Sequence, residues 1–273
     1  MGFPFRVLRI PGIIASMTEY AWLFLAAIVA GAMNSIAGGG TILTFPALIA
    51  FGMPSIQANA TSTFALLIGI VGSLYGYRAH LASARTWVIR FAPVCILGGF
   101  LGAWLLTRTS EQTFDRLVPF LIFFATLLFL LNNIIRRFAG FESMALAKTK
   151  GALAAAMVLQ AGVALYGGYF GAGIGILMLA TLGLLGLHHI HEMNAIKTIL
   201  AALINIVAAA YFAFAGLIIW PQALVMTLGA CVGYFVGAHY AQRVPQRYVR
   251  ILIGVIGISL SLVFFWREFL SRG

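Results

Sequence analysis

Acidic side chains are scarce in this sequence, which carries 6 Asp and Glu residues against 17 Lys and Arg in a chain of 273 residues. None of the acids lies between Leu23 and Ser110 or between Ser143 and His191. Charged residues of both signs make up 8% of the chain, hydrophobic residues make up 62%, and the mean hydropathy is +1.03. A soluble domain needs far more surface charge, so the composition excludes an ordinary soluble protein and predicts one that lies in a lipid bilayer.

Several motifs of soluble enzymes are also missing. The two cysteines, Cys95 and Cys231, lie inside apolar runs without the spacing of a metal site, and we expect them to be small buried hydrophobic residues. The chain contains no phosphate-binding sequence that ends in Gly-Lys-Ser or Gly-Lys-Thr, and no set of nucleophile, base and orienting residue. We therefore expect no enzyme activity, no cofactor and no ATP hydrolysis by this chain.

A histidine-rich segment leaves one enzymatic alternative open. His188, His189, His191 and Glu192 could bind zinc or iron, as histidine clusters do in some intramembrane enzymes. Such an enzyme needs further His or acidic ligands, and the chain has only two other histidines. We expect no metal ion here, with a membrane-embedded metal-dependent enzyme as the alternative interpretation.

Ten apolar runs follow one another along the chain without a long polar insertion, which predicts one all-α polytopic membrane domain. Eight runs are close to the about 20 residues that cross about 30 Å of hydrocarbon. The second and the seventh are too short to cross, so we expect broken or re-entrant helices there. The runs cover about residues 20–37, 41–51, 58–77, 86–106, 114–135, 152–169, 174–186, 193–217, 222–242 and 247–266.

The runs form a duplicated unit of five. Asn59-Ala60 matches Asn194-Ala195 at an offset of 135 residues, and the glycine-rich segment 98–103 matches 233–238 at the same offset. An odd number of segments inserts the second unit upside down relative to the first. We therefore expect two inverted repeats, residues 1–150 and residues 151–273, within one membrane domain.

Positive charge gathers in the connections on one side of this layout, and not on one face of a fold, so we expect no nucleic-acid partner. The positive-inside rule places that side in the cytoplasm and both termini outside. The residues that indicate this orientation are Arg78, Arg85 and Arg90, then Arg136, Arg137, Lys148 and Lys150, and then Arg243, Arg247 and Arg250.

Two glycine-rich sequences interrupt the runs: Gly38-Gly39-Gly40, the first break, and Gly171-Ala172-Gly173, the second break. A helix that starts at such a break directs unpaired N–H groups and the positive end of its dipole at a ligand, which favours an anion. The lack of nearby carboxylates fits the same ligand. The alternative role of glycine is close helix packing, which we expect for Gly98, Gly102, Gly229, Gly233 and Gly237.

Hydrogen-bond donors and one cation accompany the breaks. Lys197 takes in the second unit the place of Ser62 in the first, where it could attract an anion, snorkel to the surface or pair with Glu192. Each hydroxyl has the alternative of bonding to its own helix backbone. We predict an asymmetric anion site, with hydroxyl and amide donors from one half and a positive charge from the other. The predicted site residues are Asn34, Gly38, Gly39, Gly40, Thr41, Asn59, Thr61, Ser62, Thr63, Gly171, Gly173, Asn194, Lys197 and Thr198.

The segment Ala30-Gly31-Ala32-Met33-Asn34-Ser35-Ile36-Ala37-Gly38-Gly39-Gly40, followed by Asn59-Ala60-Thr61-Ser62, resembles the first-half signature of the TauE/SafE family, also called the toluene sulfonate uptake permease family. The likeness extends over the whole chain, with a weaker second signature from Gly167 to Gly175. It implies a bacterial or archaeal inner-membrane carrier of small sulfur-containing anions such as sulfite, thiosulfate, sulfonates or organosulfur acids. Lys197 stands where members commonly have a Thr- or Ser-containing sequence, which leaves the particular anion open.

An inside-negative membrane potential favours anion exit by about 2.3 kcal/mol per charge per 100 mV. Export therefore needs no coupling ion, and we expect export by alternating access around a site near the membrane midplane. Uptake coupled to H⁺ or Na⁺ is the alternative direction. The expected partners are the small sulfur-containing anion and the lipid bilayer, and the layout allows a homodimer.

Overall fold

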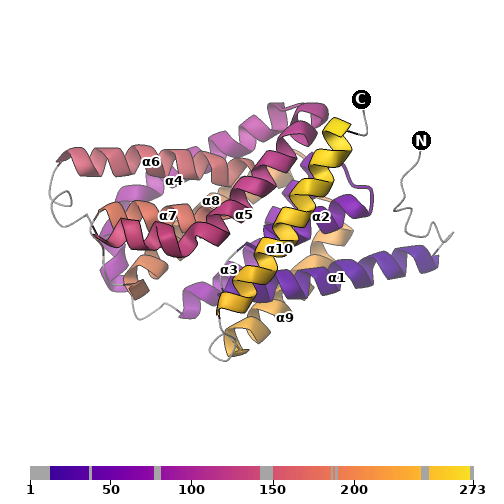
Figure 1. Ribbon diagram of the computed structural model, residues 1–273, viewed down its shortest axis with the longest axis horizontal. Helices are drawn as coiled ribbons and strands as arrows, with labels where there is room; N and C mark the ends of the chain where they lie inside the picture. Colours follow the sequence, from indigo (N-terminus) through magenta and orange to yellow (C-terminus); the bar gives the residue numbers. More distant parts are fainter. Residues whose placement is uncertain are drawn as a thin grey trace.

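The computed structural model describes residues 13–36, 39–76, 81–141, 150–185, 187, 190–240 and 246–270. These ranges form ten α-helices, the last of which ends in a π-helical turn, Trp266–Leu270 (Figure 1). The α-helices are α1 Ile13–Ile36, α2 Thr41–Ala50, α3 Ser55–Gly76, α4 Leu81–Arg108, α5 Glu111–Phe141, α6 Lys150–Tyr169, α7 Ile174–Leu184, α8 Ile190–Phe214, α9 Trp220–Tyr240 and α10 Gln246–Phe265. This order confirms the ten predicted segments, including the short second and seventh.

The helix ends differ from the ends of the apolar runs. Helix α4 begins at Leu81 where the run predicted a start near residue 86, and α5 continues to Phe141 where the run predicted an end near residue 135. Arginine has a high helix propensity and is well solvated, so a helix continues through basic residues beyond its apolar part. Hydrophobicity predicts the apolar part of each helix and not its full length.

Five of the described helices are long and apolar enough to cross a membrane: α1, α4, α5, α8 and α9. Helices α2 and α7 and the Leu153–Tyr169 part of α6 are shorter apolar helices. The predicted class, a polytopic helical membrane protein, agrees with these lengths. The larger predicted set of eight full spans stays a prediction.

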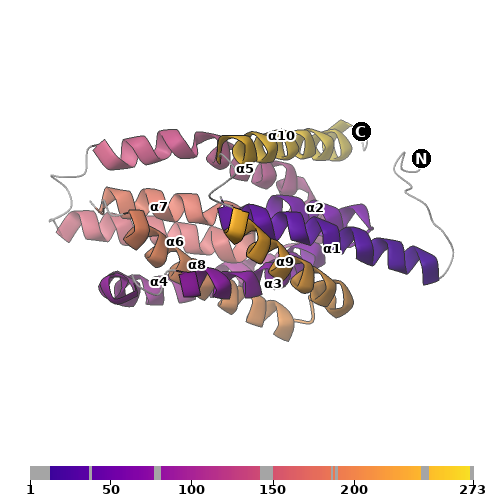
Figure 2. The same ribbon diagram turned by 90° about the horizontal axis from the view of Figure 1, so that it is seen from below.

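The long helices pack in two groups, and a further pair, α5 and α10, lies beside them. Helix α1 packs along α9, which also contacts α3, and α4 packs between α6 and α8. Each short helix contacts the helix before it and the helix after it. Helices α5 and α10 pack on each other and lie together along one side of the remaining helices (Figure 2).

Phenylalanine rings join the short helix α2 to the second break. The Phe45 ring of α2 lies 5.6 Å from the Phe170 ring, which directly follows α6, and 6.3 Å from the Phe114 ring of α5, measured between centroids. All three side chains are almost completely buried. Edge-to-face aromatic pairs of this kind stabilise a core beyond their buried area. The apolar core therefore connects elements from both halves of the sequence.

Glycines make the closest contacts between long helices. A Cβ atom on Gly102 of α4 would lie 2.1 Å from the carbonyl oxygen of Leu165 in α6, and one on Gly233 of α9 would lie 2.0 Å from that of Ile28 in α1. Such distances leave room for a hydrogen atom only. The packing role that the sequence predicts for these two glycines is confirmed.

We expect Gly102→Ala to lower the free energy of unfolding by about 1–3 kcal/mol, because the methyl group meets backbone that cannot rotate away. The matched control is Gly162→Ala in α6, where nothing lies within 4 Å of the added methyl group. The control should leave stability unchanged or raise it by about 0.5–1 kcal/mol. Thermal unfolding of the purified proteins in detergent measures both, and equal melting temperatures would refute the packing role.

Candidate functional site

The two glycine breaks lie against the same turn of α5. A Cβ atom on Gly39 would lie 2.4 Å from the ring of Phe129, and one on Gly173 would lie 3.4 Å from Leu128 and 3.7 Å from the Cα atom of Ala125. Residues 125–129 span little more than one helical turn. The fold therefore brings together two sequences that lie more than a hundred residues apart.

Positive backbone φ angles explain why glycine occupies the breaks. The φ angle is +90° at Gly39, +82° at Gly171 and +80° at Gly173, a region that other L-amino acids rarely adopt. At each break one helix ends and a short one begins in a new direction. Gly38, which is part of the predicted site, lies outside the described residues.

The first break is capped by the protein itself. The N–H group of Gly40 donates to Oδ1 of Asn34 at 2.7 Å, and Nδ2 of Asn34 donates to the hydroxyl oxygen of Tyr234 in α9 at 2.9 Å. Asn34 thereby occupies one of the N–H groups that a helix start leaves unpaired. In this structure both polar ends of the Asn34 amide hold the break in shape.

Hydroxyl groups of the first half bond mainly to protein atoms. Ser62 and Thr44 share a buried hydrogen bond of 2.6 Å between α3 and α2, and Thr61 accepts a hydrogen bond of 3.1 Å from the backbone N–H of Ile219, just before α9. Thr63 donates to its own helix backbone at 2.9 Å. Ser62 and Thr61 therefore fix α3 against its neighbours, whereas Thr63 bonds within α3.

The second break is held differently. The hydroxyl of Tyr166 in α6 donates to the carbonyl oxygen of Ala172 at 2.8 Å. The bond holds a backbone carbonyl group of this break and does not use its N–H groups. Neither Gly40 before α2 nor Gly173 before α7 provides a side-chain cap, but among the described residues Asn34 accepts from the N–H of Gly40 and no side chain does so for Gly173. The positive end of α7 is therefore the more available of the two helix starts for an anion.

Lys197 of α8 lies beside the first turn of α7. A Cβ atom on Gly175 would lie 3.3 Å from Cδ and 3.9 Å from Cε of this lysine, whose side chain is half-buried. The charge of a lysine and the positive end of a helix both favour an anion as ligand. Among the other predicted residues, Thr198 is buried, and Thr41 and Asn194 are half-buried.

Two asparagine amides flank the second break. Nδ2 of Asn59 in α3 donates to the carbonyl oxygen of Tyr169 at 3.0 Å, and Tyr169 is the last residue of α6. Nδ2 of Asn205 in α8 donates to the carbonyl oxygen of Ala201 at 2.8 Å, and its Oδ1 lies 4.0 Å from the place of a Cβ atom on Gly171. In both residues one of the two amide N–H groups is used within the protein.

Asn205 is a residue that the sequence prediction missed. It stands alone in an apolar stretch, and its link to the break depends on how α7 folds back along α8. The available signal was its position two helical turns after Lys197, on the same side of α8.

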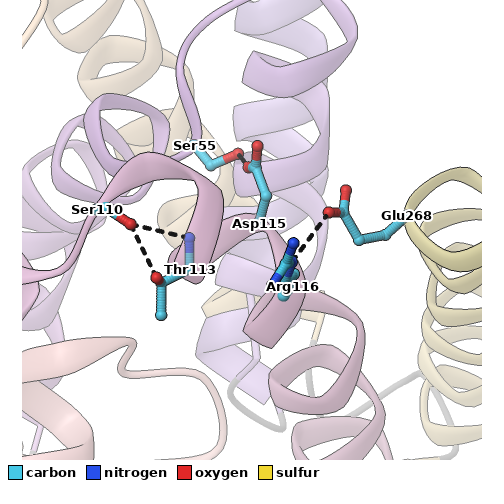
Figure 3. A network of polar contacts seen from close by, with 6 residues as sticks. All are labelled: Ser55, Ser110, Thr113, Asp115, Arg116 and Glu268. Atoms are coloured by element: carbon cyan, nitrogen blue, oxygen red, sulfur yellow. Dashed lines mark hydrogen bonds and ion pairs between the residues drawn. The ribbon is translucent and has the colours of Figure 1, made fainter. Parts of the chain in front are cut away.

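The acidic side chains at the start of α5 serve a different purpose. The Ser55 hydroxyl donates to Asp115, and Arg116 lies 4.0 Å from Glu268 near the end of the chain (Figure 3). Glu111 accepts a hydrogen bond of 3.1 Å from the backbone N–H that follows Ser55. Carboxylates at a helix N-terminus stabilise it, so these acids anchor the start of α3.

A metal centre does not appear among the described residues, where no group of three or more His, Cys, Asp or Glu side chains could hold an ion. His188, His189 and the side chain of His191 lie outside the described residues. The cluster behind the enzymatic alternative is therefore not part of the geometry described above.

The sequence model of one protein family, described as Sulfite exporter TauE/SafE, matches residues 23–264. The chain belongs to the TauE/SafE family. Similar proteins include the probable membrane transporter protein ORF9 of Sinorhizobium sp, 27% identical over 244 residues, which covers 89% of this chain and 90% of the relative. The probable membrane transporter protein YfcA of Escherichia coli strain K12 is 29% identical over 247 residues, which covers 88% of this chain and 87% of the relative.

A probable membrane transporter protein of Haemophilus influenzae is 28% identical over 244 residues, which covers 88% of this chain and 92% of the relative. No solved structure matches the chain. The family and the names of its relatives make this TauE/SafE protein a membrane transporter, in agreement with its apolar helices.

Proposed function

We propose that this TauE/SafE transporter carries a small sulfur-containing anion out of a bacterial or archaeal cell, across the inner membrane. The observation that supports it most strongly is the position of Lys197 beside the first turn of α7. A lysine and the positive end of a helix attract the same ligand, and the sequence has no acid from Ser143 to His191 that could repel it. The sulfur chemistry follows the description of the family, which names sulfite.

The contacts between helices support an inverted repeat. Helix α1 packs on α9 as α6 packs on α4, and α3 packs on α9 as α8 packs on α4. Exchanging the first five helices with the second five preserves these contacts, which a twofold relation between repeats requires. We propose that residues 1–150 and 151–273 are inverted repeats with eight full spans, two short helices and both termini outside.

The turn of α5 between residues 125 and 129 supports a route for alternating access. It touches both breaks, so a movement of α5 against the two short helices would change both sides of the site together. An inside-negative potential favours export of the anion by about 2.3 kcal/mol per charge per 100 mV, without a coupling ion. Uptake with H⁺ or Na⁺ is the competing direction.

A binding screen tests the class of ligand. Purified protein is heated with sulfite, sulfate, thiosulfate, taurine or sulfoacetate, and with chloride as the control anion. A ligand at 100 times its dissociation constant stabilises the folded state by about 2.7 kcal/mol, so a true substrate raises the melting temperature measurably. A shift with sulfur-containing anions and none with chloride is expected, and the absence of a shift with all five would contradict the proposal.

A further inference from the structure

We infer that the anion is bound in a protonated form, as a singly charged hydrogen oxyanion such as hydrogen sulfite, whose O–H group donates to the amide oxygen of Asn59. The inference rests on the proposed function and adds the protonation state of its substrate. It places a hydrogen-bond acceptor, as well as positive charge, at the second break.

The orientation of the Asn59 amide carries the first step. Its Nδ2 donates to the carbonyl oxygen of Tyr169 at 3.0 Å, and turning the amide over would bring two oxygen atoms together, so the hydrogen bond fixes the side chain. The residue is 0% exposed, and Oδ1 has no partner among the described residues. Buried polar atoms are nearly always paired, so this oxygen is open to a donor that the described residues do not supply.

The place of Asn59 carries the second step. Its partner Tyr169 ends α6 and directly precedes the residues of the second break, which lead to the start of α7. Asn205 approaches the same break from α8, with its Nδ2 bonded to Ala201 and its Oδ1 close to Gly171. Each amide uses one of its two N–H groups in these bonds, and the oxygen of Asn59 is buried and left without a partner among the described residues.

The positive charge of the region determines which kind of ligand can donate to Oδ1 of Asn59. A bare metal cation would pair with amide oxygens, but Lys197 and the positive end of α7 repel it. An anion without a proton would set one of its oxygens against Oδ1 of Asn59, which is repulsive. In the proposed arrangement a hydrogen oxyanion meets both requirements: its charged oxygens are attracted by the lysine and the α7 N–H groups, and its O–H group donates to the amide oxygen.

The test measures flux of labelled sulfite through proteoliposomes that contain the full chain, at equal pH on both sides and at zero voltage. Sulfite changes between the hydrogen sulfite and the sulfite dianion near neutral pH. We expect the initial rate at fixed low total sulfite to fall about tenfold per pH unit above this ionisation. Methanesulfonate does not ionise in this range, so its rate shows any effect of pH on the protein itself.

Asn59→Leu keeps about the size of the side chain and removes the acceptor together with the hydrogen bond to Tyr169. We expect it to raise the KM for sulfite about tenfold and to leave transport of methanesulfonate within about twofold. The matched control is Gln160→Leu, which removes a buried amide that donates to Sγ of Cys95, away from both breaks, and should transport as wild type.

The outcomes separate the two proposals. Absence of flux for every sulfur-containing anion would overturn the proposed function. A sulfite flux that rises with the concentration of the dianion would overturn the inference of a protonated substrate. So would an Asn59→Leu variant whose transport of sulfite and of methanesulfonate falls equally. In both cases the carrier function stands. If Asn59→Leu does not fold, the pH profile of the wild type decides alone.

Discussion

The Lys197→Met variant is expected to fold normally and to lose at least about 30-fold in anion flux, which corresponds to the about 2–5 kcal/mol that a desolvated charge pair contributes. Methionine preserves the unbranched stem that packs on Gly175, so the change removes the positive charge and little else. Because α7 alone would then face the anion, both affinity and rate should fall. Initial rates of sulfite flux in proteoliposomes measure the loss.

Two companion variants make this experiment specific. Lys197→Arg keeps the charge and should retain most of the flux. Arg90→Gln removes a different positive charge, on α4. The guanidinium carbon of Arg90 lies 5.4 Å from the centre of the Trp87 ring, and the flux of this variant should stay within about twofold of wild type. Full flux in Lys197→Met would show that the second break does not bind the anion.

The Gly39→Ala variant should be the most destabilised of the single changes at the breaks. Alanine at a φ angle of +90° costs about 1–2 kcal/mol, and its methyl group would lie 2.4 Å from the Phe129 ring, which adds about 1–3 kcal/mol of overpacking. Because Phe129 belongs to the α5 turn that touches both breaks, flux should fall as well. The melting temperature and the flux are measured on the same preparation.

The control separates backbone strain from collision. Gly52 has a φ angle of +85° with nothing within 4 Å of an added methyl group. Gly52→Ala therefore introduces backbone strain without a steric collision. It should lose less stability than Gly39→Ala, and the double variant Gly39→Ala with Phe129→Leu should relieve part of the collision. Equal losses at Gly39 and Gly52 would mean that the contact with Phe129 has no role.

Much of the fold can be predicted from hydrophobicity. Lengths of apolar runs give the ten helices, because an apolar segment in lipid must satisfy its backbone hydrogen bonds within itself. The shortness of α2 and α7 and the glycines beside them also locate the breaks. The ends of α4 and α5 were less predictable, since polar residues there remain helical.

The roles of polar side chains at the breaks were harder to predict. Asn34 bonds to Tyr234, 200 residues away in the sequence, and Ser62 pairs with Thr44, so a single sequence does not show which atoms are already used. Asn59 has the residue type of a donor, but one N–H bonds to Tyr169 and its Oδ1 is without a partner among the described residues. Residue types locate a polar site, whereas its chemistry depends on contacts between distant segments.

Efflux of labelled sulfite from proteoliposomes, with the membrane voltage clamped and wild type and Lys197→Met measured side by side, is the most direct test of anion transport through the second break. Wild type should show saturable efflux that rises with an inside-negative voltage and needs no proton or sodium gradient, and Lys197→Met should lose at least about 30-fold. Efflux no faster than from protein-free vesicles, or equal in the two proteins, would contradict it.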